Sequence, residues 1–96
     1  MKAILHPLVH VDIAEAMEFY DREGDAHLAA DFFREVERTI DALTQRPGSF
    51  AQHDTVLRRA SIHRFPFHML FSVEQDYLFI LVLRHERRDP HFGLDR

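Results

Sequence analysis

The chain has 96 residues and no cysteine. Neither a disulfide framework nor a thiolate metal site can therefore supplement its core, so hydrophobic packing must hold the fold together. A domain of this size buries only somewhat more than about 60% of its unfolded surface, and we expect modest stability. The hydrophobic content of 46% suits a packed core.

Long hydrophobic runs are also missing. The longest uninterrupted apolar run, residues 77–83, is far shorter than the roughly 20 residues that span a bilayer. The N-terminal residues show no basic stretch followed by an apolar one, which is the pattern of a secretory signal. We therefore expect a soluble, cytoplasmic protein that does not enter a membrane and needs no cofactor.

Lysine is nearly absent, since Lys2 is the only one among twelve basic residues, and the net charge is −4. The charge is unevenly distributed: residues 12–41 hold ten acids and three arginines, whereas residues 46–96 hold eight arginines, six acids and five of the eight histidines. The second half can attract an anion while the first half repels it. Charge alone does not demand nucleic-acid binding, because strong adhesion to phosphates needs more clustered cations.

No repeat, low-complexity tract or linker divides the chain, which predicts a single domain over residues 1–96. Residues 2–10 mix apolar side chains with His6 and Pro7. Proline cannot donate to a central ladder, so this stretch fits an edge strand. His6 and His10 are four apart, as metal ligands on a helix are, but Pro7 argues against that helix, and we expect no metal site.

Two helices are expected to follow. Asp12 with Glu15 resembles a capping box, and the next apolar residues recur at helical spacing over residues 13–23. A second start at Asp25 leads into an apolar stripe with charged residues opposite, which predicts a helix over residues 25–44. The two helices should form an antiparallel hairpin.

The apolar period then changes from helical to alternating. Residues 67–73 alternate cleanly and predict a half-buried strand, and residues 77–83 are apolar at both parities, as in a central strand. The polar residues 74–76 are short enough to close a hairpin. Residues 56–65 alternate less cleanly and give a further strand. The predicted fold is α+β, with the order β-α-α-β-β-β and a helical hairpin packed on a mainly antiparallel twisted sheet.

Phenylalanine is the main large aromatic residue, with nine copies. We expect most of these rings in the core and not on a base-stacking platform. Phe33→Ala or Phe71→Ala should then cost about 3 to 5 kcal/mol. The expected core rings are Phe32, Phe33, Phe65, Phe67, Phe71 and Phe79.

Five short stretches carry a resemblance in addition to these patterns: His6-Pro7, Phe32-Phe33, Leu57-Arg58-Arg59, Arg64-Phe65-Pro66-Phe67 and His85-Glu86-Arg87-Arg88-Asp89-Pro90. Together with the order of elements, they resemble the RelE/ParE superfamily of toxins from bacterial type II toxin–antitoxin systems. The similarity spans almost the whole chain. It implies a small toxin that arrests growth, acts in plasmid stabilization and is neutralised by a cognate antitoxin, in complexes of two or more chains.

The resemblance leaves two targets open. RelE-like members resemble ribosome-dependent endoribonucleases that cut messenger RNA, whereas ParE-like members inhibit DNA gyrase and are not enzymes. Metal-free RNA cleavage needs a base, an acid and cations for the phosphorane charge. Glu86 supplies one carboxylate; the other nuclease candidates are Arg59, Arg64, His68, His85 and Arg88.

Three features favour the ParE-like branch. Lysine is scarce and the net charge is negative, whereas a protein that docks in ribosomal RNA should be basic. Phe92 stands where many nuclease members have a tyrosine. The run His85-Glu86-Arg87-Arg88-Asp89-Pro90 resembles ParE-like chains more than the nucleases. In addition, on regular strands His85 shares a face with Arg87 but not with Glu86 or Arg88, so at most part of the nuclease set can line one groove. A degenerate, non-toxic binding module is the third hypothesis.

Arginines dominate the surface predicted to bind the target or the antitoxin. A structural role is the competing interpretation: Arg87 and Arg88 can pair with acids on the helices or with Asp95, and His85 can be a hydrogen-bonded structural histidine. A disordered antitoxin peptide would gain backbone pairing from a sheet edge and could place acids against the cations. The predicted binding residues are Arg58, Arg59, Arg64, Arg84, Arg87 and Arg88.

Overall fold

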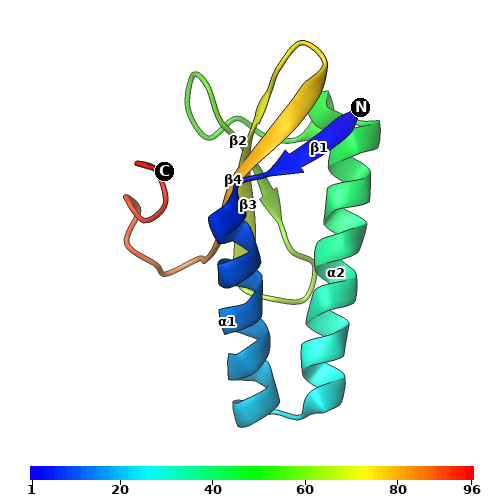
Figure 1. The fold of residues 1–96 in the computed structure, drawn as a ribbon, viewed down its shortest axis with the longest axis vertical. Coiled ribbons are helices and arrows are strands. Elements are labelled where there is room, and N and C mark those ends of the chain that lie inside the picture. The colour runs from blue at the N-terminus through cyan, green and yellow to red at the C-terminus, as the bar shows by residue number, and fades with distance from the viewer.

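Two helices and four strands follow one another in the predicted order β-α-α-β-β-β in the computed structural model, which describes residues 1–96 (Figure 1). A short 3₁₀ helix, η1, follows the second α-helix. The elements are β1 (Lys2–Leu5), α1 (Pro7–Glu23), α2 (Ala26–Gln45), η1 (Pro47–Ser49), β2 (Arg58–Ser61), β3 (Phe67–Val73) and β4 (Tyr77–His85).

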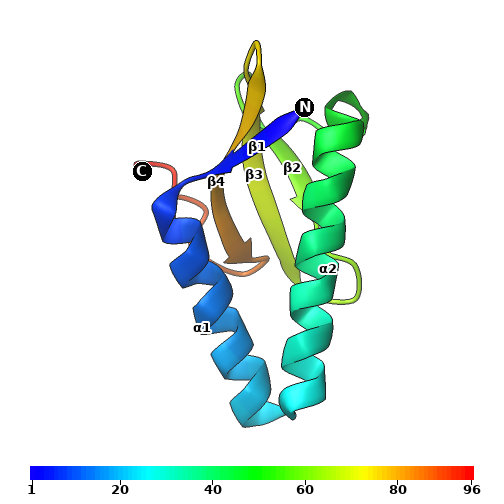
Figure 2. The ribbon, with the colours of Figure 1, turned by 45° about the vertical axis from the view of Figure 1, so that its right-hand side comes forward.

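The four strands form one mixed sheet in the order β1-β4-β3-β2. β1 pairs with β4 in parallel, whereas β4–β3 and β3–β2 are antiparallel. The two helices form a hairpin that covers one face of this sheet (Figure 2). The predicted α+β class and the helical hairpin on a mainly antiparallel sheet are therefore confirmed.

The start of α1 differs from the prediction. The helix begins at Pro7, directly after the four-residue strand β1, and not near residue 13. Proline suits the first helical turn, where its missing N–H has no partner to lose. His6 acts as the N-cap, because its Nδ1 accepts the Leu8 N–H at 3.1 Å. Asp12 is consequently a mid-helix residue and not a cap.

α2 agrees with the prediction, but one of its phenylalanines does not. Asp25 caps the helix by accepting the Leu28 N–H at 2.8 Å. Phe32 is fully buried, whereas its neighbour Phe33 is 40% exposed. The placement of Phe33 in the core is wrong, because consecutive residues on a helix are about 100° apart and only one of them can face the sheet.

The core lies between the helical hairpin and the inner face of the sheet. It contains Phe32, Phe65 and Phe71, with Phe67 packed against it. Phe79 is only half-buried and lies outside this cluster. The core residues are Val9, Ile13, Ala16, Phe32, Val36, Leu43, Ala60, Ile62, Phe65, Met69, Phe71, Leu78, Ile80 and Leu83.

The sheet also buries its outer face, where the C-terminal segment packs. Leu70 and Val82 point away from the helices and are fully buried. Gly93 lies against Val82 with a φ of +81°, and a Cβ at this glycine would come within 2.5 Å of Val82 Cγ2. Only glycine fits such an approach at a positive φ. Neither helix combines the length and the hydropathy of a bilayer-crossing segment.

Candidate functional site

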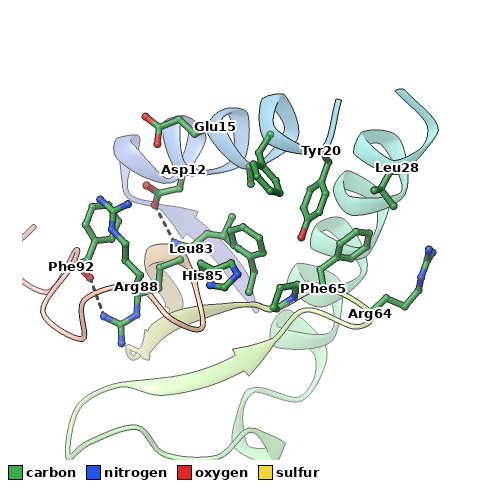
Figure 3. A pocket seen from close by; sticks show the side chains of 15 residues that line it. Asp12, Glu15, Tyr20, Leu28, Arg64, Phe65, Leu83, His85, Arg88 and Phe92 are labelled. Carbon is green, nitrogen blue, oxygen red and sulfur yellow. Dashed lines mark hydrogen bonds between the residues drawn. The ribbon is translucent and has the colours of Figure 1, made fainter. Parts of the chain in front are cut away.

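A pocket of about 640 Å³ opens between α1, the turn before β3, the end of β4 and the C-terminal segment. Its apolar lining is largely aromatic. In Figure 3, Arg64 lies at one end of the pocket and Arg88 at the other, with Leu83 and His85 between them. The aromatic lining residues are Phe19, Tyr20, Phe65, Phe67 and Phe92.

Arg64 is the only non-glycine residue with a positive φ, at 74°. This left-handed conformation is costly for a side chain with a Cβ, and such strain concentrates at functional sites. The conformation lets the turn between β2 and β3 present the guanidinium at the pocket rim. There it lies 5.4 Å from the centre of the Phe65 ring and 3.6 Å from Asp31 Oδ2. Neither contact buries the charge, since the Arg64 side chain is 51% exposed.

The strain predicts an unusual response to glycine. Arg64→Gly should leave the free energy of unfolding unchanged or raise it by up to about 1 kcal/mol, because glycine adopts this φ without steric cost. The matched control is Arg34→Gly on the exposed side of α2, which should lose about 1 kcal/mol. Urea denaturation measures both variants. An Arg64→Gly protein that loses as much stability as the control would contradict this account.

A second cluster of the predicted residues lies on the outer face of the sheet, across β2, β3 and β4. Arg59 forms an ion pair with Glu86. Glu86 Oε2 lies 3.3 Å from His68 Nδ1, a contact that falls short of regular hydrogen-bond geometry. His68 Nε2 accepts the Arg84 Nε–H at 2.9 Å. Arg59, Glu86, His68 and Arg84 therefore contact one another in that order.

Arg84 is a structural residue and not a free surface cation. It is 5% exposed, and its Nη1 donates to the carbonyl oxygens of Pro90 and Phe92 at 2.7 and 3.1 Å. Burial lowers the pKa of its guanidinium. Its role is to fasten the C-terminal segment to β4.

His68 is neutral near pH 7. Burial and then the charge of Arg59 lower the pKa of His68 to about 4, although Glu86 acts in the opposite direction. Because Nε2 accepts from Arg84, the single proton of the neutral ring is on Nδ1 and faces Glu86. A histidine that is 2% exposed, with Nε2 bonded to Arg84 and Nδ1 facing Glu86, is poorly placed to exchange protons with a substrate.

The lowered pKa of His68 makes stability depend on pH. The unfolded chain binds a proton on His68 below pH 6.5, but the folded chain does so only near pH 4. Stability should therefore fall as the pH decreases from about 6.5 to 4, by about 3 kcal/mol in total from this group. His68→Gln, whose amide can meet both Arg84 and Glu86, should flatten this part of the profile. Equal pH dependence of the two proteins in urea denaturation would rule out the assigned cause.

A buried ion pair joins α1 to the C-terminal residue. Asp12 accepts two hydrogen bonds from Arg96, at 2.6 and 2.8 Å, and a third from the Leu83 N–H at 3.1 Å. The side chains of Asp12 and Arg96 are only 5% and 8% exposed. The hydrogen bonds that Arg96 donates to Asp12 raise the pKa of Arg96. This pair occupies the β4 edge that β1, ending at Leu5, leaves unpaired.

No local pattern indicates this pair directly, since Asp12 and Arg96 are 84 residues apart. An acid within the apolar stripe of α1 was the one available signal. Asp12 lies between the buried residues Val9 and Ile13 on the same helix. The sequence would predict a buried carboxylate at Asp12 only if the helix were known to begin at Pro7, because Asp12 then lies on the buried face and not at the N-cap.

The structure divides the residues predicted from the sequence between separate places. His68 faces the outer side of the sheet and His85 the pocket, so the two candidate acid–base groups are not brought together. Arg58 donates to the Phe50 carbonyl oxygen at 2.8 Å. Arg87 is exposed and makes no ion pair. The pocket contains Arg64, His85 and Arg88, the outer face contains Arg59, His68 and Glu86, and Arg84 joins His68 while also lining the pocket.

The pairing of Arg87 and Arg88 with helix acids or with Asp95 is wrong. Arg88 instead lies over the Phe92 ring, with its guanidinium carbon 3.9 Å from the ring centre. Such a contact leaves the hydrogen-bonding edge of the guanidinium free, because only its face meets the ring. Arg88 therefore remains available at the end of the pocket opposite Arg64.

No family model matches the sequence, and no curated protein matches it. Among solved structures, a chain from the chromosomal ParDE TA system of P. aeruginosa matches with a TM-score of 0.78 at 17% sequence identity. The match covers 88% of this chain and 95% of that chain. The likeness shows that the two chains share a fold.

Proposed function

We propose that this protein is the toxin component of a type II toxin–antitoxin system of the RelE/ParE kind, and that a cognate antitoxin neutralises it. The fold shared with a chain of a ParDE TA system supports this proposal. The observation that carries it is the aromatic pocket with an exposed arginine at each end, Arg64 and Arg88. A pocket of this kind suits a peptide with apolar anchors and acids better than it suits a nucleic acid.

The antitoxin surface that we propose combines this pocket with a sheet edge. β2 is an edge strand. Arg59 donates its N–H outward to Ala51, and Ile62 donates inward to Phe67. Strand alternation therefore directs the Ser61 N–H outward along a free edge. An extended peptide can pair there, and its acids can reach the arginines.

Charge reversal tests this surface. Changing Arg58, Arg64 and Arg88 together to Glu should weaken binding of the small protein encoded in the adjacent reading frame by about 100-fold or more, because charge-assisted hydrogen bonds contribute about 1.5 to 3 kcal/mol each. Arg46→Glu, an exposed arginine at the end of α2, is the control and should bind normally. Calorimetry with purified proteins measures the affinities. Intact affinity in the triple variant would refute the proposed surface.

Within this class we favour inhibition of DNA gyrase over RNA cleavage. The separation of His68 from His85 supports this choice, since acid–base catalysis needs its groups around one substrate position. The single lysine supports it as well. Purified protein should reduce supercoiling by gyrase and raise the level of cleavage complexes. Unchanged levels of both would remove this hypothesis.

A RelE-like, ribosome-dependent messenger RNA endoribonuclease is the alternative. One observation favours it: His85 shares the pocket with Arg64 and Arg88, which gives one possible acid or base beside two cations. Messenger RNA that stays intact in arrested cells would exclude it. A degenerate, non-toxic binding module is the second alternative, motivated by the acidic net charge, and growth arrest on induction without antitoxin would exclude that one.

A further inference from the structure

The pocket contains two polar side chains that contact the Phe67 ring. Tyr20 comes from α1 and His85 from the end of β4. Both meet Phe67 edge to face, with ring centres 6.1 and 5.2 Å away. The Phe67 ring thus contacts both a phenol and an imidazole that line the pocket.

The Tyr20 hydroxyl is a donor that the fold does not use. Burial alone raises the pKa of Tyr20, and no hydrogen bond contributes to the shift. His68 Nδ1 is the only sealed side-chain polar atom without a partner, so the Tyr20 hydroxyl opens to the pocket, into which it points in Figure 3. Tyrosine hydroxyls near a core usually find a partner.

His85 presents a second donor. Its Nδ1 accepts the Arg87 N–H at 3.0 Å. In the neutral imidazole the proton is then on Nε2, because one ring nitrogen donates while the other accepts. The bond from Arg87 therefore fixes the tautomer that offers an N–H.

The charged groups near these two donors do not accept hydrogen bonds from them. Asp12 is saturated by Arg96 and the Leu83 N–H. Glu15 lies on the rim and interacts with Arg96, whose pKa it helps to raise. Arg84 already donates hydrogen bonds to His68 and to two carbonyl oxygens. Arg64 and Arg88 stay exposed at the two ends.

We propose that this pocket recognises a carboxylate next to an apolar side chain on a peptide segment of the partner. The apolar side chain packs against Phe65 and Phe67, and the carboxylate accepts from the Tyr20 hydroxyl and the His85 Nε2–H. Complementarity of charge supports an acidic occupant, because Tyr20 and His85 offer donors, both ends of the pocket are cationic, and the lining carboxylate without an ion pair, Glu15, lies at the rim beside Arg96. The inference deepens the proposed antitoxin-binding role of the pocket and rests on it for the identity of the partner.

A pair of small probes tests this on the full chain. 3-Phenylpropionate carries a phenyl ring and a carboxylate, and 3-phenylpropanamide carries the same ring without the charge. Titrations followed by NMR should show the carboxylate binding about 10-fold more tightly than the amide, as one charge-assisted hydrogen bond provides. The aromatic signals of Tyr20, Phe67 and His85 should shift.

Tyr20→Phe keeps the ring and removes only the unused hydroxyl, so it should preserve thermal stability and reduce the preference for the carboxylate, of which the His85 donor keeps a part. Tyr77→Phe changes the one other tyrosine, which lies outside the pocket, and should keep that preference. Equal binding of both probes, an unchanged preference in Tyr20→Phe, or no binding of the carboxylate at its solubility limit would each overturn the inference. The readout does not involve growth arrest, so its failure is distinguishable from failure of the proposed toxin role.

Discussion

Phe32→Ala should destabilise the protein by about 3 to 5 kcal/mol, a large share of the stability of a domain this small. Phe32 is fully buried. Its ring centre lies 5.4 Å from that of Tyr20, 5.2 Å from that of Phe65 and 5.1 Å from that of Phe67. Truncation would open a cavity where α1, α2 and β3 meet. Urea denaturation monitored by circular dichroism measures the loss.

The neighbouring residue provides the matched control. Phe33→Ala makes the same chemical change one position along the same helix, but Phe33 is 40% exposed. We expect it to cost less than about 1 kcal/mol, because little buried surface is lost. Equal losses at the two positions would contradict the described orientation of α2. The small loss expected at Phe33 is lower than the sequence predicted, because the sequence placed Phe33 in the core and expected a correspondingly large loss of stability for Phe33→Ala.

Asp12→Ala should have an effect of similar size, about 3 to 5 kcal/mol. Removal of the carboxylate leaves the Arg96 guanidinium buried without its partner and the Leu83 N–H without its acceptor, and breaking one side of a buried pair typically costs this much. Glu15→Ala, one turn further along α1 and exposed, should cost less than about 1 kcal/mol. Urea denaturation again gives both values.

A double variant separates the lost pair from the lost carboxylate. Asp12→Ala combined with Arg96→Ala should be more stable than the sum of the two single changes implies, because no unpaired charge remains buried. Strict additivity would mean that the two side chains do not interact in solution. The C-terminal segment would then have to be held to β4 by Arg84 and Gly93 alone.

The parts of the fold that the sequence predicted correctly depend on local, periodic signals. The apolar stripe of α2 and its N-cap at Asp25 were predicted, and the structure confirms both. β3 alternates, and β4 is apolar at both parities because helices cover one face and the C-terminal segment the other. Such signals are read from neighbours in the chain, so no tertiary information is needed.

The wrong predictions concern residues whose type is compatible with two different local structures. Pro7 fits both an edge strand and the first turn of a helix, and only the His6 cap and the parallel pairing of β1 decide between them. Phe33 is apolar like its neighbour, yet the helical period admits only one of the two to the core. Arg96 contacts Asp12, which lies 84 residues earlier in the chain. A contact of that kind leaves no mark on the local pattern.

The sequence indicated the charged candidate residues, but it did not indicate Tyr20 or which candidates the fold groups together. The parity rule correctly separates His85 from Glu86, since β4 ends at His85 and the two face different sides. The rule fails for Arg88, which a turn after β4 returns to the pocket beside Phe92. Arg84 was predicted to bind a partner because it is an arginine at a strand end, but it is buried and has a structural role. Burial depends on where the C-terminal segment packs, which the sequence does not reveal.

The most direct test of the toxin proposal is growth of a bacterial culture after induction of this protein, alone or together with the small protein encoded beside it. We predict that the protein alone arrests growth and that the neighbouring protein restores it. Arg64→Glu with Arg88→Glu should not respond to that rescue if it remains toxic. Cells that accumulate the folded wild-type protein and continue to grow at the uninduced rate would contradict the toxin assignment.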